Sequence, residues 1–283
     1  MSIPVSATSS FARFRKNRLA LAAVTLLVAL HVVVALAPWI APYRPEAVEL
    51  FRRLEAPSRE HWLGTDEYGR DVLSRLLYGG QVSLAVALGS MVASMIIGVA
   101  VGAIAGYVGG TSDTVLMRIT DGMLAVPLFF IALMALAMLG ATIVNLVAVI
   151  ALSSWMTVAR AVRAEVLRTR ELEFVLAARA IGCSRPRILV KHVVPQSLPS
   201  ITVAATLGVA FAVLLETALS FLGLGVQPPA ASWGNMLSGA RGYLRTSPGL
   251  AVMPGVLIFV TVLGYNWFGD GLRDAIDPTL GER

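Results

Sequence analysis

The stretch LALAAVTLLVALHVVVALAPWI, residues 19–40, is a run of 22 residues without a formal charge. A helix of this length rises about 33 Å at 1.5 Å per residue, which is enough to cross the roughly 30 Å hydrocarbon core of a bilayer. The whole chain of 283 residues is 57% hydrophobic and only 14% charged, whereas soluble domains carry about 25% charged residues. The sequence therefore predicts an all-α polytopic membrane protein.

Four more regions are long and apolar enough to supply further spans. Residues 122–159 are uncharged and fit two spans that fold back near 139–141, the first of which starts near Leu116. The others are residues 76–112 (centred on 83–107), residues 201–222 (interrupted only by Glu216) and residues 250–266 with their flanks. We therefore predict six transmembrane helices. Prolines end or kink helices, and we expect this of Pro127, Pro195, Pro199 and Pro254.

The first apolar run has an alternative interpretation as a cleaved signal peptide. Basic residues precede it, and Ala35–Leu36–Ala37 resembles a cleavage site. However, a signal peptide has an apolar core of only about 7–15 residues. The longer run favours a retained transmembrane helix.

The distribution of basic residues predicts the orientation of the spans. Residues 1–18 contain four basic residues and no acidic ones, and residues 160–191 contain eight basic and three acidic ones. Residues 44–75 are nearly balanced, with six basic and seven acidic residues. Because cytoplasmic loops are enriched in Lys and Arg, we expect the N-terminus and the 160–195 loop in the cytoplasm and the 41–75 loop outside. Six spans then return the C-terminus to the cytoplasm.

The basic loop contains the segment EFVLAARAIGCSRPRILVKHVVP, residues 173–195. Phe174, Ala177, Ala178 and Ile181 follow the i, i+3, i+4, i+7 template of one helical face. Gly182 fits a helix C-terminal cap, and Ser184 fits the N-cap of a second short helix. The small alanines would allow close approach of a partner, and the neighbouring arginines suit carboxylates. A helix lying on lipid headgroups is the alternative.

This segment resembles the coupling loop, known as the EAA loop, of ABC-importer permeases. The resemblance rests on Leu176–Ala177–Ala178, then Gly182, then Pro195. Leu176 departs from the general pattern, which has Glu at this position, and His192 and Val194 stand where the pattern has Ile and Leu.

Four other segments resemble the dipeptide/oligopeptide/nickel family of these permeases, and specifically its C-type subunit. They are HWLGTDEYGRDVLSRLLYGGQVSL (61–84), MRITDGMLAVP (117–127), ETALSFLGLGVQPPAASWGNML (216–237) and NWFGDGLRDAIDP (266–278). They occur in the family's order and cover most of residues 61–278.

The resemblance implies a type I ABC importer permease fold in a bacterial or archaeal inner membrane. It implies a homologous B-type permease as partner, one or two ABC ATPase subunits that hold ATP and Mg²⁺, and an external substrate-binding protein. Dipeptides or oligopeptides would enter by alternating access. Nickel or another small solute is an alternative cargo, and a secondary transporter or channel that needs no ATPase is a third alternative. The expected coupling residues are Glu173, Phe174, Leu176, Ala177, Ala178, Arg179, Gly182 and Arg187.

The expected organisation follows from these regions. It comprises a cytoplasmic segment (1–18), a first transmembrane helix (19–40), an external loop (41–78), a permease core with the coupling loop 160–195 (79–278) and a tail (279–283).

The sequence gives no indication of catalysis in this chain. Its two lysines, Lys16 and Lys191, do not complete G-x-x-x-x-G-K-[ST], so no P-loop is present. With one cysteine, Cys183, and three histidines, we expect no disulfide framework, metal site or cofactor. The chain has a net charge of +6, and its charged residues lie between apolar spans. This distribution argues against nucleic acid as a partner.

A few polar residues lie in or beside the spans. Arg118, Asp121 and Glu216 are the candidates for the translocation path or a gate. We expect Arg118 and Asp121 to form an ion pair with each other or with a neighbouring helix. Glu216, deeper in its span, would contact a substrate group or metal ion, or form a gate or subunit contact. Gly98, Gly102, Gly106 and Gly110 have the small-xxx-small spacing of close helix packing or of a sliding surface.

Outside the membrane, the 41–78 and 223–249 loops would meet the binding protein or form a lid over the bundle. The candidate residues there are Asp66, Arg70, Asp71, Gln227 and Trp233. Thr65 is expected to cap a short helix that contains an Asp71–Arg75 ion pair.

Overall fold

The computed structural model describes residues 7–276, and every regular element in that range is a helix. Five helices are long and apolar enough to cross a membrane: α2 (Arg18–Ala35), α4 (Val72–Val108), α7 (Ile143–Thr169), α10 (Val194–Phe221) and α12 (Gly249–Ile276), with α10 extended at its start to Arg185. The shorter elements are α1 (Ala7–Lys16), α3 (Ala37–Ile40), η1 (Leu50–Arg52), α5 (Gly110–Leu124), α6 (Leu128–Leu139), α8 (Glu173–Ala180), α9 (Arg185–Ile188), η2 (Leu189–Val193), α11 (Trp233–Ala240) and η3 (Arg241–Tyr243). The expected tail, 279–283, lies outside the described residues.

The third predicted span is not one straight helix. It consists of α5 and α6, which meet at an angle of 82°. The helix ends because Pro127, the N-cap of α6, has no backbone N–H and disfavours helical geometry in the residue before it. The predicted six spans are obtained only when this bent pair is counted as one.

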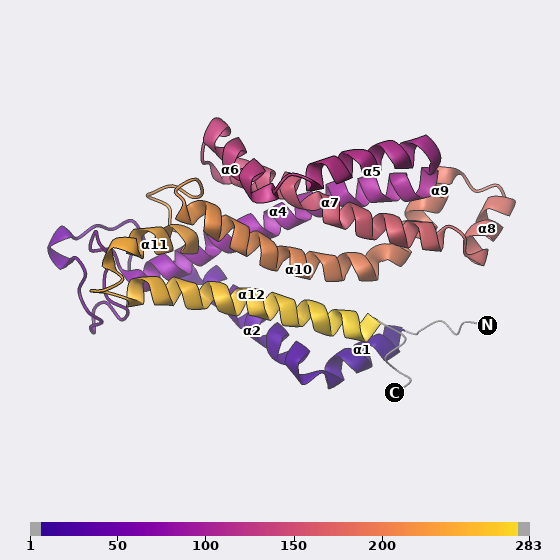
Figure 1. Cartoon of the computed structure of the whole chain (residues 1–283). Helices are drawn as coiled ribbons and strands as arrows, with labels where there is room; N and C mark the ends of the chain where they lie inside the picture. The colour runs from indigo at the N-terminus through magenta and orange to yellow at the C-terminus, as the bar shows by residue number, and fades with distance from the viewer. Residues whose placement is uncertain (1–6, 277–283) are drawn as a thin grey trace.

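The long helices lie side by side along one axis (Figure 1). α4 packs on α7, α10 lies against α4, α7 and α12, and α2 covers α12. α8 and α9 lie at the end of the bundle where α1 and the end of α12 are found, whereas residues 41–71 and α11 lie at the opposite end (Figure 1). The two segments that the charge pattern assigns to the cytoplasm, residues 1–18 and 160–195, therefore share one end of the bundle in their described parts.

Three glycines bring α4 against α7 at backbone distance. A Cβ added to Gly98 would lie 2.6 Å from the Val158 Cβ, and one added to Gly102 would lie 2.4 Å from the Ala159 carbonyl oxygen. Gly106 meets Val166 in the same way. Gly110, the fourth glycine of the predicted series, lies beyond the end of α4 and has no atom near its Cβ position. The series of contacts is thus one turn shorter than the sequence spacing indicates.

Ion pairs attach α5 to α7. The Arg163 guanidinium donates to both carboxylate oxygens of Asp113, at 2.5 and 2.6 Å. Asp121 pairs with Arg160 one further turn along α7. These long-range pairs hold the first half of the bent span against α7.

We predict that Gly102→Ala lowers the thermal stability of the detergent-solubilised protein. The methyl group has no space beside the Ala159 carbonyl, so the helices must separate, and overpacking of this kind costs about 1–3 kcal/mol. Thermal unfolding monitored by gel filtration measures the effect. Gly255→Ala is the matched control, because a Cβ there meets no atom within 4 Å and alanine favours the helix. Equal melting temperatures for the two variants would contradict the close contact.

Candidate functional site

The predicted helix–turn–helix in the 160–195 loop is confirmed. α8 ends at Gly182, whose φ of +81° is in the left-handed region that glycine adopts readily. Gly182 N–H donates to the Arg179 carbonyl at 3.0 Å, and Cys183 N–H donates to the Ala178 carbonyl at 3.1 Å. These two bonds form a Schellman motif. Ser184 then occupies the N-cap position of α9.

The buried face of α8 differs from the one that the helical template indicates. Of the four residues that the template places on one face, only Ala178 is buried. Val175, outside the template, is the other buried residue of the helix. Both belong to a cluster that also contains Ile188 of α9. This i, i+3 pair faces the apolar core, and Phe174, Leu176 and Ile181 are left 43%, 45% and 81% exposed.

The charged residues of this loop are exposed. Glu173, Arg179 and Arg187 all lie on the surface. The Arg179 guanidinium lies 5.7 Å from the ring centre of Tyr107 at the end of α4, which orients it by a cation–π contact. Glu173 and Arg187 have no ion-pair partner between residues 7 and 276.

A second polar cluster, at the opposite end of the bundle, is centred on Glu216. This carboxylate is fully buried and accepts hydrogen bonds from Ser220 Oγ at 2.7 Å and Ser83 Oγ at 3.1 Å. The two serine oxygens accept in turn from the backbone N–H groups of Val226 and Trp233. Glu216 therefore connects α4, α10 and the segment that leads into α11, and in this conformation it is inaccessible to a solute.

The loop that the sequence predicts to be external is organised by Asp66 rather than by the predicted Asp71–Arg75 pair. Asp66 Oδ2 lies 2.7 Å from Arg70 Nε and 3.3 Å from Arg75 Nε. Asp71 is itself the N-cap of α4, accepting from Ser74 N at 2.8 Å and from His61 Nδ1 at 2.9 Å. The predicted capping role of Thr65 is also wrong.

Thr65 does not cap a helix, because α4 starts only at Val72. Instead it hydrogen-bonds to the backbone of the preceding loop. Its hydroxyl accepts from Glu55 N at 2.9 Å and donates to the Arg52 carbonyl. The sequence suggests an N-cap because Thr65 is a suitable residue type, but the helix begins only after Asp71, which has the stronger capping geometry.

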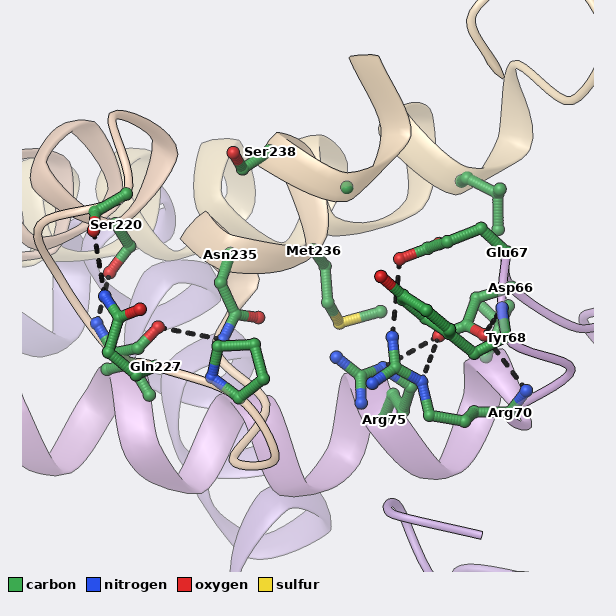
Figure 2. A pocket seen from close by; sticks show the side chains of 16 residues that line it. Asp66, Glu67, Tyr68, Arg70, Arg75, Ser220, Gln227, Asn235, Met236 and Ser238 are labelled. Atoms are coloured by element: carbon green, nitrogen blue, oxygen red, sulfur yellow. Dashed lines mark hydrogen bonds and ion pairs between the residues drawn. The ribbon is translucent and has the colours of Figure 1, made fainter. Parts of the chain in front are cut away.

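The two segments that the sequence predicts to be external meet around a cavity of about 240 Å³. Figure 2 shows Asp66, Glu67, Tyr68 and Arg70 on one side and Asn235 and Ser238 on the α11 side, with Met236 between them. Of the five external candidates, Asp66, Arg70, Asp71 and Trp233 are buried by the chain itself, and only Gln227 is exposed. Any effect of the buried four on a partner would act through the shape of the loop.

The arginine–aspartate motif of α5 does not form the mutual pair. Asp121 pairs with Arg160 of the neighbouring helix α7, which was the other arrangement that the sequence allowed. Arg118 is exposed and has no ion-pair partner among residues 7–276. The sequence did not single out Arg160, Ser83 or Ser220. The partner of Arg160 is distant in the chain, and the two serines look like any other serine in a span.

We predict that Glu216→Ala destabilises the protein much more than Glu216→Gln. Alanine leaves the Ser83 and Ser220 hydroxyl groups without their acceptor, and each buried group left unsatisfied costs about 1–3 kcal/mol. Glutamine retains one carbonyl oxygen, and the hydroxyl groups can rotate to accept from its amide. Thermal unfolding in detergent measures both variants. If Ala and Gln had the same melting temperature, the hydrogen bonds of Glu216 would not carry this part of the fold.

Comparisons with known proteins agree with this architecture. The family model for the inner membrane component of binding-protein-dependent transport systems matches residues 98–281. The model for the N-terminal transmembrane domain of oligopeptide transport permease C matches residues 8–57.

Two relatives match nearly the whole chain. The dipeptide transport system permease protein DppC of Alkalihalophilus pseudofirmus is 40% identical over 271 residues, which are 96% of this chain and 89% of that protein. The glutathione transport system permease protein GsiD of Escherichia coli O6:K15:H31 is 41% identical over 269 residues, which are 95% of this chain and 89% of that protein.

A solved structure shows the same fold. A chain of the inward-facing MetNI methionine ABC transporter superposes with a TM-score of 0.58 at 19% identity, covering 72% of this chain and 97% of that one. The helical bundle is thus the type I importer fold. Together with the family match and the two relatives, it places this chain among the multi-pass inner-membrane permease subunits of binding-protein-dependent ABC importers.

Proposed function

We propose that this permease moves dipeptides or oligopeptides into the cytoplasm by alternating access. The cargo assignment is supported by the names of the two relatives, one a dipeptide and the other a glutathione permease. Glutathione is itself a short peptide, so both names indicate peptide cargo rather than nickel. ATP and Mg²⁺ would be held by separate ATPase subunits.

The observation that carries the coupling role is the exposed surface of α8 and the turn after it. Phe174, Leu176 and Ile181 present apolar side chains at the end of the bundle where α8 projects (Figure 1). Exposed apolar patches on ordered elements are typical of sites that a partner covers. We assign this surface to an ATPase subunit, and the apolar Leu176 at the first position of the loop motif makes the contact apolar there.

The connections of the loop suit it to transmit motion. α8 follows the end of α7 after three residues, and α9 continues through η2 into α10. Val175 and Ala178 anchor α8 in the same apolar cluster as Ile188. A displacement of α8 would therefore be delivered to the ends of two membrane helices rather than absorbed by a flexible loop.

The opposite end of the bundle would meet the external binding protein, and a B-type permease would complete the path. Gln227 is the exposed candidate for the first contact, although its amide already donates to the Gly223 carbonyl at 2.9 Å.

Copurification and stimulated hydrolysis test this function. A tagged chain expressed with its neighbouring transport genes should bring down an ATPase and a second permease. In liposomes, the complex should hydrolyse ATP faster when the binding protein carries peptide than when it carries Ni²⁺. Absence of an associated ATPase, or stimulation by Ni²⁺ alone, would overturn the proposal.

We predict that Gly182→Leu uncouples ATP hydrolysis from transport while the protein still inserts and folds. The residue has space within this chain, because a Cβ at Gly182 meets no atom within 4 Å. The leucine side chain would instead occupy the volume assigned to the ATPase. The positive φ adds strain of about 1–3 kcal/mol, and this strain needs its own control.

Gly140→Leu provides that control. Gly140, in the turn between α6 and α7, has a φ of +85° and equally open surroundings, and its ψ of 152° makes a leucine there at least as strained as at Gly182. Peptide uptake and ATP hydrolysis are measured for both variants. Equal transport by the two would contradict the placement of the docking surface at Gly182.

A further inference from the structure

The exposed side chains of α5 and of the two residues after it, Ala125 and Val126, fall into two stripes of opposite character. One stripe is apolar, with Val115, Ile119 and Val126 each about half exposed. The other consists of Thr114, Arg118, Asp121 and Ala125, which are also exposed and are spaced by three or four residues on one helical face. Within a single helix, the surface thus changes from apolar to charged around its circumference.

The charged stripe continues onto α7. Asp121 and Arg160 join the two helices, yet their side chains remain 50% and 52% exposed. Thr157, Ala161 and Ala164 are the exposed neighbours of Arg160 on α7. The result is a face of charged and small residues, here called the polar face, in helices that are otherwise apolar enough to span a membrane.

Lipid is an unfavourable neighbour for this face. Ionised side chains within membrane spans face a water-filled cavity, the interior of a bundle or another charged group. In this chain the Asp121–Arg160 pair is neutral as a unit but half exposed, and Arg118 is a full charge without a partner among the described residues. The polar face therefore requires water or another protein surface against it.

The break between α5 and α6 is an independent observation of the same kind. The helix stops at Leu124 and resumes at Leu128, and the intervening residues 125–127 are exposed in this chain. Irregular backbone at membrane depth occurs only where it lines a cavity or is covered by protein. Ala125 lies both at this break and on the polar face, so the two observations indicate one location.

The charge of the polar face identifies what it would attract. Arg118 and Arg160 supply two positive charges and Asp121 one negative charge, which leaves one positive charge in excess. The adjacent Asp113–Arg163 pair is balanced and does not alter this difference. An unpaired guanidinium matches a carboxylate in shape and charge, and a peptide with a free C-terminus carries a carboxylate at neutral pH.

We propose that the polar face is this chain's wall of the translocation path and that Arg118 binds the carboxylate of the passing solute. The identity of the solute as a peptide rests on the proposed function. The contact of the face with water and its preference for anions do not depend on the proposed function, because they follow from the charges and the broken helix.

Thiol labelling in the assembled complex tests whether the face is wet. Cys183 is the single native cysteine and is replaced by serine, or its labelling is subtracted if that replacement impairs assembly. Ala125→Cys should react with charged, water-soluble methanethiosulfonates, with or without ATP, whereas Ile119→Cys on the apolar stripe should not. If Ala125→Cys and a second reporter, Thr157→Cys, are both as unreactive as Ile119→Cys, a protein surface covers the face and the proposal is wrong.

The preference for anions is measured on the Ala125→Cys background. With each rate divided by that of the same reagent with a free thiol in solution, the sulfonatoethyl reagent should be favoured over the trimethylammonioethyl reagent, and Arg118→Gln should lower this rate ratio at least about threefold. This is the size expected for a unit charge about 10 Å away, seven residues along a helix, in a wet cavity. Arg273→Gln, an exposed arginine in the last turn of α12, is the matched control. A ratio that is unchanged by Arg118→Gln, or changed equally by Arg273→Gln, would overturn the role of Arg118.

The labelling experiment needs no transported peptide, so its outcome is separable from that of the proposed function. If the complex labels as expected but shows no peptide-stimulated hydrolysis, the water-exposed polar face is supported and the peptide cargo is contradicted. In a complex that does transport peptide, Arg118→Gln should also slow uptake, whereas Arg273→Gln should not.

Discussion

The backbone contact between α4 and α7 is the constraint on which the rest of the bundle depends. Because Gly98, Gly102 and Gly106 have no side chains, the two helices approach so closely that the contact leaves no space for a Cβ atom at these positions. Membrane helices gain little from hydrophobic burial against one another, so close packing of small residues is one of their main sources of association energy. The other elements are then placed relative to this pair: α5 is paired to α7 by two arginine–aspartate contacts, and α8 follows directly from its end.

The end of the bundle that holds α11 is ordered by polar interactions instead. Buried polar groups need partners in a low-dielectric environment, and here one carboxylate satisfies groups from several segments at once. Glu216 accepts from Ser83 and Ser220, whose oxygens also receive backbone N–H groups from the segment before and at the start of α11. Asp66 does the same for Arg70 and Arg75. Each carboxylate thus closes a network that apolar packing alone would leave unspecified.

The sequence predicted the features that depend on local chemistry. The apolar runs located the spans, and Gly182 and Ser184 located the turn between α8 and α9, because caps depend on only a few neighbouring residues. Features that depend on distant residues were missed or wrong. Ser83 lies 133 positions from Glu216, and the burial of Val175 in place of Phe174 depends on how α8 packs in the folded bundle. The bend at Pro127 shows a further limit: the proline predicts an interruption, but not its angle of 82°.

α10 relates the two ends of the molecule. It begins at the π-helical turn η2, directly after the segment assigned to the ATPase, and Glu216 lies about 20 residues further along it, roughly 30 Å away. A displacement of the α8–α9 turn that moves α10 as a rigid body must also move Glu216, and the bond to Ser83 passes that movement to α4. α4 is therefore held to α7 by the glycine contacts and to α10 by the bond between Ser83 and Glu216. An uncompensated charge on α5 lies beside this assembly, and for that reason a movement of α7 relative to α5 would change the surroundings of Arg118.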